Sequence, residues 1–352
     1  MKPRIPLNCS FGAPKAAYRE SFMKTFWCRN VSALVRGTGL AILVAGFLTV
    51  GCFSAAAQER LTLEDIHAAK VDPNVIYGMY SGLALVMDVY HPAQPNGYAV
   101  VFVHGGHWRM SPEVGAAPFK DGGNIVQLVQ FIKPMISAGY TVFVPEYRMA
   151  PHFLPPAEEQ DIQRAVRFIR FNAKKYGIDP DHIGGVGFSS GAQIISMVGL
   201  LDGKPTSDDL SPAGQLSGRV QAVVAGATPA NLVETAAVID DDAFTSVYIG
   251  DQVGTKVAPN STLYKRLMDA SPVTHIAPGA PPFLLIHADN DTEVPIKIEQ
   301  EFQQALEKAG VPVKMVVVPN SDHEATFVGA HADVFVPTMI QFLDQNLRGK
   351  GK

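Results

Sequence analysis

The chain contains little cysteine and little charge. Only three of its 352 residues are cysteine, and all three (Cys9, Cys28 and Cys52) lie in the first 57 residues. The other 295 residues therefore offer neither a disulfide nor a cysteine ligand for a metal. Charged residues make up 18% of the chain and hydrophobic residues 47%. This composition excludes a disordered chain and requires a substantial apolar core.

Basic charge is especially scarce after residue 57. The first 57 residues carry 7 of the 29 basic residues and 1 of the 33 acidic residues, which leaves 22 basic and 32 acidic residues and a net charge of −10 in the rest. Nucleic acids and anionic membrane surfaces attract basic patches, so neither is an expected partner of this part of the chain.

Residues 1–57 are predicted to be a secretory signal peptide. An apolar run from Thr38 to Val50 follows Arg29 and Arg36, and the small residues at 54–57 precede an expected cleavage site before Gln58. The run is shorter than the roughly 20 residues of a membrane-spanning helix, which disfavours a retained anchor.

Two alternatives remain open for this leader. Met23 would give a more ordinary basic region than Met1, so translation could start there. Cys52 could be the acylated residue of a lipoprotein, although Thr49 stands where such signals usually carry leucine. We expect an exported protein, periplasmic or extracellular, with no stable membrane insertion after processing. Residues 58–352 are then a single domain.

Short β-branched and aromatic runs predict strands in this domain. Val75–Tyr80 and Leu85–Tyr90 flank Ser81-Gly82 and predict an opening hairpin. Buried strands are predicted by the apolar runs Val100–Val103, Thr141–Val144, Ile183–Phe188, Val220–Ala225, Phe283–His287 and Val313–Val318.

Between these runs, longer stretches have helical spacing. They are Ala157–Tyr176, Ser190–Leu201, Ile296–Ala309 and Asp333–Leu347. The alternation predicts an α/β fold, with a mostly parallel sheet and helices on both faces. In such sheets the ligand lies beyond the carboxyl ends of the strands, so the residues that follow each strand are the ones to inspect.

A G-x-S-x-G sequence, Gly187 to Gly191, follows the strand that ends at Phe188. A sharp turn from strand to helix forces the central residue, Ser189, into a strained conformation and exposes its hydroxyl, and flanking glycines leave room for that turn. The helix that begins at Ser190 would direct free N–H groups at the same point. The alternative is an ordinary serine N-cap.

Two glycines, Gly105 and Gly106, follow the strand that ends at Val103, within His104-Gly-Gly-His-Trp. Their N–H groups can turn inward and form half of an oxyanion hole, and the N–H of Ser190 would form the other half. A simple glycine turn with a packed tryptophan is an alternative. A metal held by His104 and His107 is another, but no carboxylate completes a ligand set nearby in the sequence, and we predict no metal.

Acidic and imidazole groups follow the last two predicted strands. A serine hydroxyl needs a histidine to take its proton and a buried carboxylate to orient that histidine. Asp291 is the predicted acid, with Asp289 and Glu293 as rivals, and His323 is the predicted base, with His331 assigned to the final helix region. The order serine, acid, histidine is the one used on sheets of this type.

Two other motif matches fail. His323-Glu324 resembles the start of a zinc-protease helix but lacks the second histidine. Gly185 to Ser190 approaches a dinucleotide fingerprint, but Ser190 replaces the third glycine. No phosphate loop is present, and the sequence predicts no cofactor.

From about Val75 to its end, the chain resembles the α/β-hydrolase carboxylesterases, in the branch of feruloyl and acetylxylan esterases near the hormone-sensitive-lipase family. Further motifs carry this resemblance: Glu146-Tyr147-Arg148, Pro151, Pro156-Ala157, Leu263-Tyr264, Ala270-Ser271-Pro272 and Ala280-Pro281-Pro282-Phe283.

The resemblance implies an α/β-hydrolase fold and a role for each matched residue. Ser189 would be the nucleophile, Asp291 the acid and His323 the base, with Gly105, Gly106 and Ser190 as oxyanion donors. Three positions depart from the family pattern. Ala288 replaces a glycine after His287, Ser190 replaces a common alanine, and Ser321-Asp322 replaces a glycine-containing approach to His323.

Two stretches outside the strand pattern, residues 202–217 and 231–269, are candidates for a small lid over the pocket. Trp108 and His107 are the predicted substrate-binding residues. Phe153, Leu154 and Phe244 are further candidates for the pocket wall.

The sequence thus predicts a secreted serine carboxylesterase that acts on a small-molecule or carbohydrate-linked ester through an acyl-enzyme. An amide hydrolase, such as an arylformamidase or a peptidase, and a non-catalytic binding module on the same fold remain alternatives. The acyl and alcohol groups of the substrate and the oligomeric state are left open.

Overall fold

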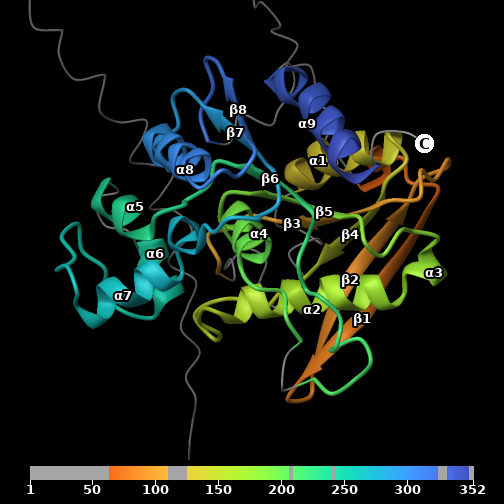
Figure 1. The fold of residues 1–352 in the computed structure, drawn as a ribbon, viewed down its shortest axis with the longest axis horizontal. Helices are drawn as coiled ribbons and strands as arrows, with labels where there is room; N and C mark the ends of the chain where they lie inside the picture. The colour runs from red at the N-terminus through yellow and green to blue at the C-terminus, as the bar shows by residue number, and fades with distance from the viewer. Residues whose placement is uncertain (1–62, 110–124, 206–208, 239–242, 324–330, 349–352) are drawn as a thin grey trace, which may run out of the picture. The chain divides into compact units, whose positions relative to one another are not determined.

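A computed structural model of the chain describes residues 63–109, 125–205, 209–238, 243–323 and 331–348 (Figure 1). The predicted signal peptide, the alternative start at Met23 and the candidate lipid site at Cys52 lie outside the described residues.

The centre of the fold is an eight-stranded sheet in the order β1-β2-β4-β3-β5-β6-β7-β8. The first two strands form the predicted antiparallel hairpin, β2 pairs antiparallel with β4, and every pair from β4 to β8 is parallel. The strands are β1 Lys70–Tyr80, β2 Leu83–His91, β3 Ala99–Val103, β4 Thr141–Pro145, β5 Ile183–Phe188, β6 Ala222–Gly226, β7 Phe283–Ala288 and β8 Val313–Val318. The predicted mostly parallel sheet is confirmed.

Helices connect the parallel strands and cover both faces of the sheet (Figure 1). The α-helices are α1 Ile125–Ser137, α2 Ala157–Phe171, α3 Ala173–Tyr176, α4 Ser190–Leu200, α5 Leu232–Val238, α6 Ala243–Ile249, α7 Thr262–Asp269, α8 Ile296–Lys308 and α9 Ala332–Leu347. Short 3-10 helices span Leu63–Ile66 (η1) and Pro272–His275 (η3). Within the described ranges, no helix has the length and apolar character needed to cross a bilayer.

The single helix predicted over 157–176 is interrupted at Asn172. Both its backbone N–H and its side-chain amide donate to the carbonyl of Phe168, at 3.0 and 2.8 Å. The side chain thus closes α2 with a local hydrogen bond, as asparagine commonly does, and the chain continues as the short α3.

The core has two layers, one on each face of the sheet. Buried residues of α2, α4 and α8 pack with β1, β3, β5 and β7 on one face, and those of α1 and α9 pack on the other. On α2 the stripe of Ile162, Ala165, Val166 and Ile169 is fully buried. Central strands with apolar residues on both faces explain why their sequences are continuous apolar runs.

The chain segment between β6 and β7 lies beside the carboxyl ends of the strands. Thr235 of α5 and Phe244 and Thr245 of α6 line a cavity there together with Ser189. The described part of the other predicted lid segment, 202–217, lines a different hollow, where Asp209 accepts a hydrogen bond from Arg164 of α2 at 3.0 Å. Of the two predicted lid segments, 231–269 therefore contributes described residues to the lining of the Ser189 cavity, and 202–217 does not.

Candidate active site

Ser189 occupies the turn between β5 and α4 with a strained backbone, φ +53° and ψ −125°. A Cβ atom on Gly187 would lie 2.4 Å from the carbonyl oxygen of Gly191, and one on Gly191 would lie 2.2 Å from that of Val103. Both positions therefore accept only glycine, as G-x-S-x-G suggests. The hydroxyl of Ser189 does not cap the helix, so the N-cap alternative is wrong.

The three side chains from separate strand ends meet in one hydrogen-bonded line. Nε2 of His323 lies 3.1 Å from Oγ of Ser189, and Nδ1 of the same ring lies 2.7 Å from Oδ2 of Asp291. All three residues are buried. Because Asp291 accepts from Nδ1, the free Nε2 lone pair can take a proton from the serine hydroxyl.

Asp291 is held as a carboxylate by several donors. Its Oδ1 accepts from the backbone N–H groups of Glu293 and Val294, at 2.9 and 2.8 Å. Burial acts to raise the pKa of Asp291, but the hydrogen bond and charge of His323 and the Val294 N–H outweigh it, so the pKa lies below its ordinary value.

The rival candidates have other partners. Asp289 accepts from the backbone N–H groups of Asn320 and Ser321 and so joins the two loops that carry Asp291 and His323. Glu293 faces His107, with Oε2 3.2 Å from Nε2. His331 lies at the N-terminal end of α9, as expected.

His287 of β7 and Glu299 of α8 form a buried pair behind Asp291. The sequence analysis does not predict this pair. Nδ1 of His287 is hydrogen-bonded to Oε2 of Glu299, and Nε2 lies 2.7 Å from the Val294 carbonyl and 3.4 Å from Oδ2 of Asp291. Burial acts to lower the pKa of His287, but the charge and hydrogen bond of Glu299, with a contribution from Asp291, raise it above its ordinary value. The signal was a histidine within an apolar strand and a glutamate twelve residues later.

The predicted oxyanion donors belong to the loop after β3 and to the first residue of α4. Gly106 has φ +131°, which favours glycine, and its carbonyl accepts from the N–H of Arg109 at 3.3 Å. The Gly105 carbonyl lies 2.8 Å from Nδ1 of His104. With both carbonyls engaged inside their own loop, the loop is fixed at the end of β3. Ser190 is the first residue of α4, where helix N–H groups have no partner within the helix.

His104 and His107 do not share a site. Nε2 of His104 lies 3.6 Å from Oε2 of Glu146, its ring stacks on Tyr147, and it is buried. The His107 ring faces Glu293 instead. The two imidazoles thus have separate carboxylate partners, and no set of three metal-ligating side chains occurs in the described ranges.

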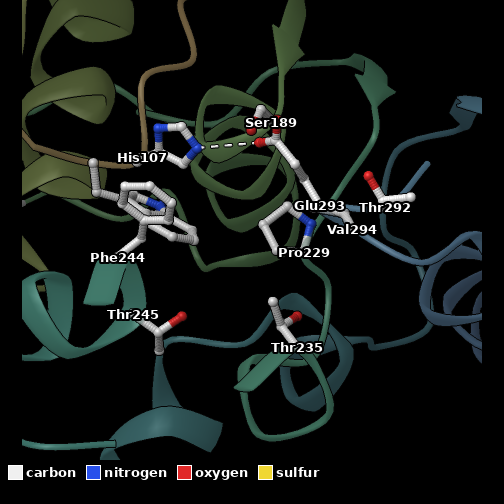
Figure 2. Close-up of a pocket in the computed structure, with 10 residues that line it drawn as sticks. His107, Ser189, Pro229, Thr235, Phe244, Thr245, Thr292, Glu293 and Val294 are labelled. Atoms are coloured by element: carbon white, nitrogen blue, oxygen red, sulfur yellow. Dashed lines mark hydrogen bonds and ion pairs between the residues drawn. The ribbon is translucent and has the colours of Figure 1, made fainter. Parts of the chain in front are cut away.

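A cavity of about 120 Å³ opens beside Ser189 (Figure 2). Trp108, His107 and Phe244 line it, as the sequence predicts. Phe153 and Leu154 do not: Phe153 packs edge-on against Tyr80, and Leu154 packs against Gly250. The remaining lining residues are Ser189, Pro229, Thr235, Thr245, Thr292, Glu293 and Val294.

Trp108 is fixed in the cavity wall by a buried polar network. Its Nε1 donates to Oε1 of Gln193 at 2.9 Å, and its ring stacks on Tyr248 of α6 with centroids 4.5 Å apart. Gln193 and Tyr248 both donate to Oε1 of Glu159, at 3.3 and 3.2 Å. Glu159 thus connects α2, the nucleophile helix and the helix over the cavity, a role the sequence did not indicate.

Comparison with known proteins gives a family match. The BD-FAE family model matches residues 87–306. Among curated proteins, "Probable carboxylic ester hydrolase LipM" of Mycobacterium tuberculosis is 26% identical over 74% of this chain and 57% of its own length. "Esterase LipC" of the same organism is 25% identical over 79% of this chain and 66% of its own length. The chain thus spans about three-fifths of the length of these relatives.

Solved structures give the same fold. A truncated carbohydrate esterase from gut microbiota superposes with a TM-score of 0.67 at 22% identity, over 82% of this chain and all of the other. The butyrate-bound esterase Est2 of Thermogutta terrifontis superposes with a TM-score of 0.62 at 20% identity, over 83% of this chain and all of the other. The fold is the α/β-hydrolase fold, as predicted.

Proposed function

The chain belongs to the BD-FAE family, and on that premise we propose that it is a serine carboxylesterase that cleaves carboxylic esters through an acyl-enzyme. The observation that carries the proposal is the hydrogen-bonded line from Ser189 through His323 to Asp291. The names of the relatives, a carboxylic ester hydrolase and an esterase, support the same reaction class.

In the first half of the reaction, Oγ of Ser189 attacks the ester carbonyl carbon while its proton moves to Nε2 of His323. The carbonyl electrons move onto the oxygen, which becomes an oxyanion. His323 then gives the proton to the leaving alcohol oxygen, and the carbon–oxygen bond of the ester breaks. Asp291 stays ionised throughout and stabilises the imidazolium.

In the second half, a water molecule takes the place of the alcohol. His323 accepts its proton, the hydroxide attacks the acyl carbon, and the released proton returns to Ser189 as the carboxylic acid leaves. The N–H groups of Ser190, Gly105 and Gly106 are the proposed oxyanion donors in both halves. The strained turn at Ser189 fixes the hydroxyl before the substrate binds.

The dimensions of the cavity favour a small ester with a short acyl group, because one cavity beside Ser189 must hold the acyl group and the first atoms of the alcohol. Its volume of about 120 Å³ lies below the roughly 300–1,000 Å³ typical of pockets for drug-sized ligands. A panel of acetyl, butyryl, longer acyl and feruloyl esters of one alcohol tests this. We expect kcat/KM to be highest for acetyl to butyryl esters. Preference for the feruloyl ester would contradict a short-acyl pocket.

The decisive test of the proposed function is Ser189→Ala. We expect kcat/KM on a short-chain ester to fall by at least about 10³-fold, because the nucleophile is removed while binding remains. Labelling by a fluorophosphonate should occur in the wild type and be absent in the variant. Unchanged hydrolysis by Ser189→Ala would contradict the proposal. A matched amide substrate, cleaved faster than the ester, would favour the amide-hydrolase alternative.

Export of the protein is also part of the proposal, and it rests on the sequence of residues 1–57 alone. N-terminal sequencing of the mature protein should give Gln58 as the first residue. Acylated Cys52 at the N-terminus would instead indicate a lipoprotein.

A further inference from the structure

Two loops face each other beside Ser189 through one polar contact. Nε2 of His107, from the loop after β3, lies 3.2 Å from Oε2 of Glu293, from the loop after β7. Both side chains remain partly exposed, 37% for His107 and 41% for Glu293. Figure 2 shows this pair beside Ser189, with Phe244 under the imidazole.

The pair is held in place from both sides. The Phe244 ring of α6 stacks on His107 with centroids 3.8 Å apart, and the Arg109 guanidinium lies 4.4 Å from the centre of the same ring. The backbone N–H of Glu293 donates to Oδ1 of Asp291 at 2.9 Å, so Glu293 is tied to the acid of the triad. Its position relative to the reacting groups is therefore fixed.

Glu293 is present as a carboxylate. The hydrogen bond from His107 lowers the pKa of Glu293 below its ordinary value, against a smaller opposing effect of burial, and His323, when protonated, acts in the same direction as His107. When His107 is the neutral donor of that bond, the pair carries one negative charge.

That charge lies next to the position that the leaving alcohol must occupy. Oε2 of Glu293 is 3.7 Å from Nε2 of His323, the same nitrogen that faces Oγ of Ser189. In an acyl transfer this nitrogen gives its proton to the alcohol oxygen, so the alcohol oxygen must lie within hydrogen-bonding distance of it. The substituents on that alcohol are then close to the Glu293 carboxylate.

We propose that Glu293 is a specificity-determining residue that selects the alcohol part of the ester by charge. It disfavours esters whose alcohol carries a negative charge and favours those whose alcohol carries a positive charge. This inference rests on the proposed function, because it assigns the alcohol side of the site from the proton transfer by His323. At separations of several ångströms near a protein surface, one charge is worth about a tenfold change in rate.

Three acetate esters with the same acyl group test the proposal. Acetylcholine carries a cation, 3,3-dimethylbutyl acetate is its uncharged isostere, and 2-sulfoethyl acetate carries an anion. We measure kcat/KM for each at pH 8 and at low ionic strength, where screening is weak. For the wild type we expect the order cation, neutral, anion.

In Glu293→Gln, which removes the charge and keeps the shape, kcat/KM should fall about tenfold for the cationic ester and rise about tenfold for the anionic ester, so their ratio should fall by about a hundredfold. Glu301→Gln is the matched control, since Glu301 lies on the exposed side of α8 in an ion pair with Lys297 and lines no part of the cavity. It changes the net charge equally and should keep the wild-type ratio. Added salt should reduce the ratio in the wild type.

A second pair of variants keeps the proposal testable if Glu293→Gln does not fold. Glu293→Asp keeps the charge and should keep the order of the three esters, whereas Glu293→Asn should lose it. An unchanged ratio in a folded Glu293→Gln or Glu293→Asn would overturn the proposal. If the wild type cleaves none of the three esters and resists fluorophosphonate labelling, the proposed function itself fails instead.

Discussion

Two regions connected to the nucleophile helix α4 hold buried carboxyl groups, and these carboxyl groups differ in charge. In the loop after β7, Asp291 accepts from three N–H donors, and its pKa is lowered. At the start of α2, Glu158 is fully buried and accepts no hydrogen bond from another described residue; burial, with the neighbouring Glu159, raises its pKa to about 9.

The comparison shows that donors, and not residue type or burial, decide the charge of a buried acid here. Asp291 must be ionised to stabilise the imidazolium of His323. Glu158 has no cation to stabilise and is most stable as a neutral acid. Burial also raises the pKa of Glu159, and the hydrogen bonds from Gln193 and Tyr248 oppose this only in part.

The largest expected effect is on kcat/KM, and it comes from removing the charge of Asp291. Asp291→Asn should lower kcat/KM by about 10³- to 10⁴-fold, because an amide can no longer fix the tautomer of His323 or stabilise its cation. Glu158→Gln is the matched control at pH 7, since an amide replaces a neutral acid of the same shape, and its kcat/KM should stay within about threefold. Similar losses in the two variants would remove the distinction between the groups.

A second test concerns the pair behind Asp291. Glu299→Gln should lower the free energy of unfolding by about 3 kcal/mol, because it leaves the buried His287 cation without its counter-charge. Urea denaturation monitored by circular dichroism measures this. Glu301→Gln, which breaks an exposed ion pair with Lys297, should cost less than about 0.5 kcal/mol. Equal costs would mean that the buried pair carries no charge.

The third test uses the pH dependence of stability. With a pKa of about 9 in the folded state and an ordinary value near 4.5 when unfolded, Glu158 binds more protons in the folded chain between these pH values. Its contribution therefore falls as the pH rises from 5 to 9, by about 1 kcal/mol per pH unit. In Glu158→Gln the free energy of unfolding, measured by urea denaturation at several pH values, should vary less with pH over this window. A parallel profile would show that Glu158 is ionised in the fold.

Asp291 contributes in the opposite sense. Its pKa is lowered on folding, so the stability it contributes is present above the unfolded value near 4 and is lost as the pH falls below it. The two groups thus act in separate pH windows.

The sequence predicts the sheet well because five of its eight strands, β3 to β7, lie inside the sheet, are buried throughout and read as apolar runs. It also predicts the positions of Ser189, Asp291 and His323, because each directly follows a strand and parallel strands bring their carboxyl ends together. Ser189 and Gly187 needed no tertiary information, since the turn itself requires them, whereas Gly191 is required by the carbonyl of Val103 on the neighbouring strand.

The sequence could not predict contacts between residues from distant segments. Glu159 and Tyr248 are 89 positions apart, and nothing in either local pattern indicates that they meet. Phe153 and Phe244 are equally suitable aromatic candidates in the sequence, yet only Phe244 lies in the cavity wall, because α6 brings it there. Helix α1 was missed because its stretch is apolar over much of its surface and contains Pro134.

The close approach of Gly191 to the carbonyl of Val103 ties the reactive turn to the neighbouring strand β3. The turn at Ser189 cannot relax unless β3 separates from β5 at the centre of the sheet. The strained turn therefore has no local route to relaxation of its own: heat or denaturant should release it only when the pairing of β3 with β5 is lost.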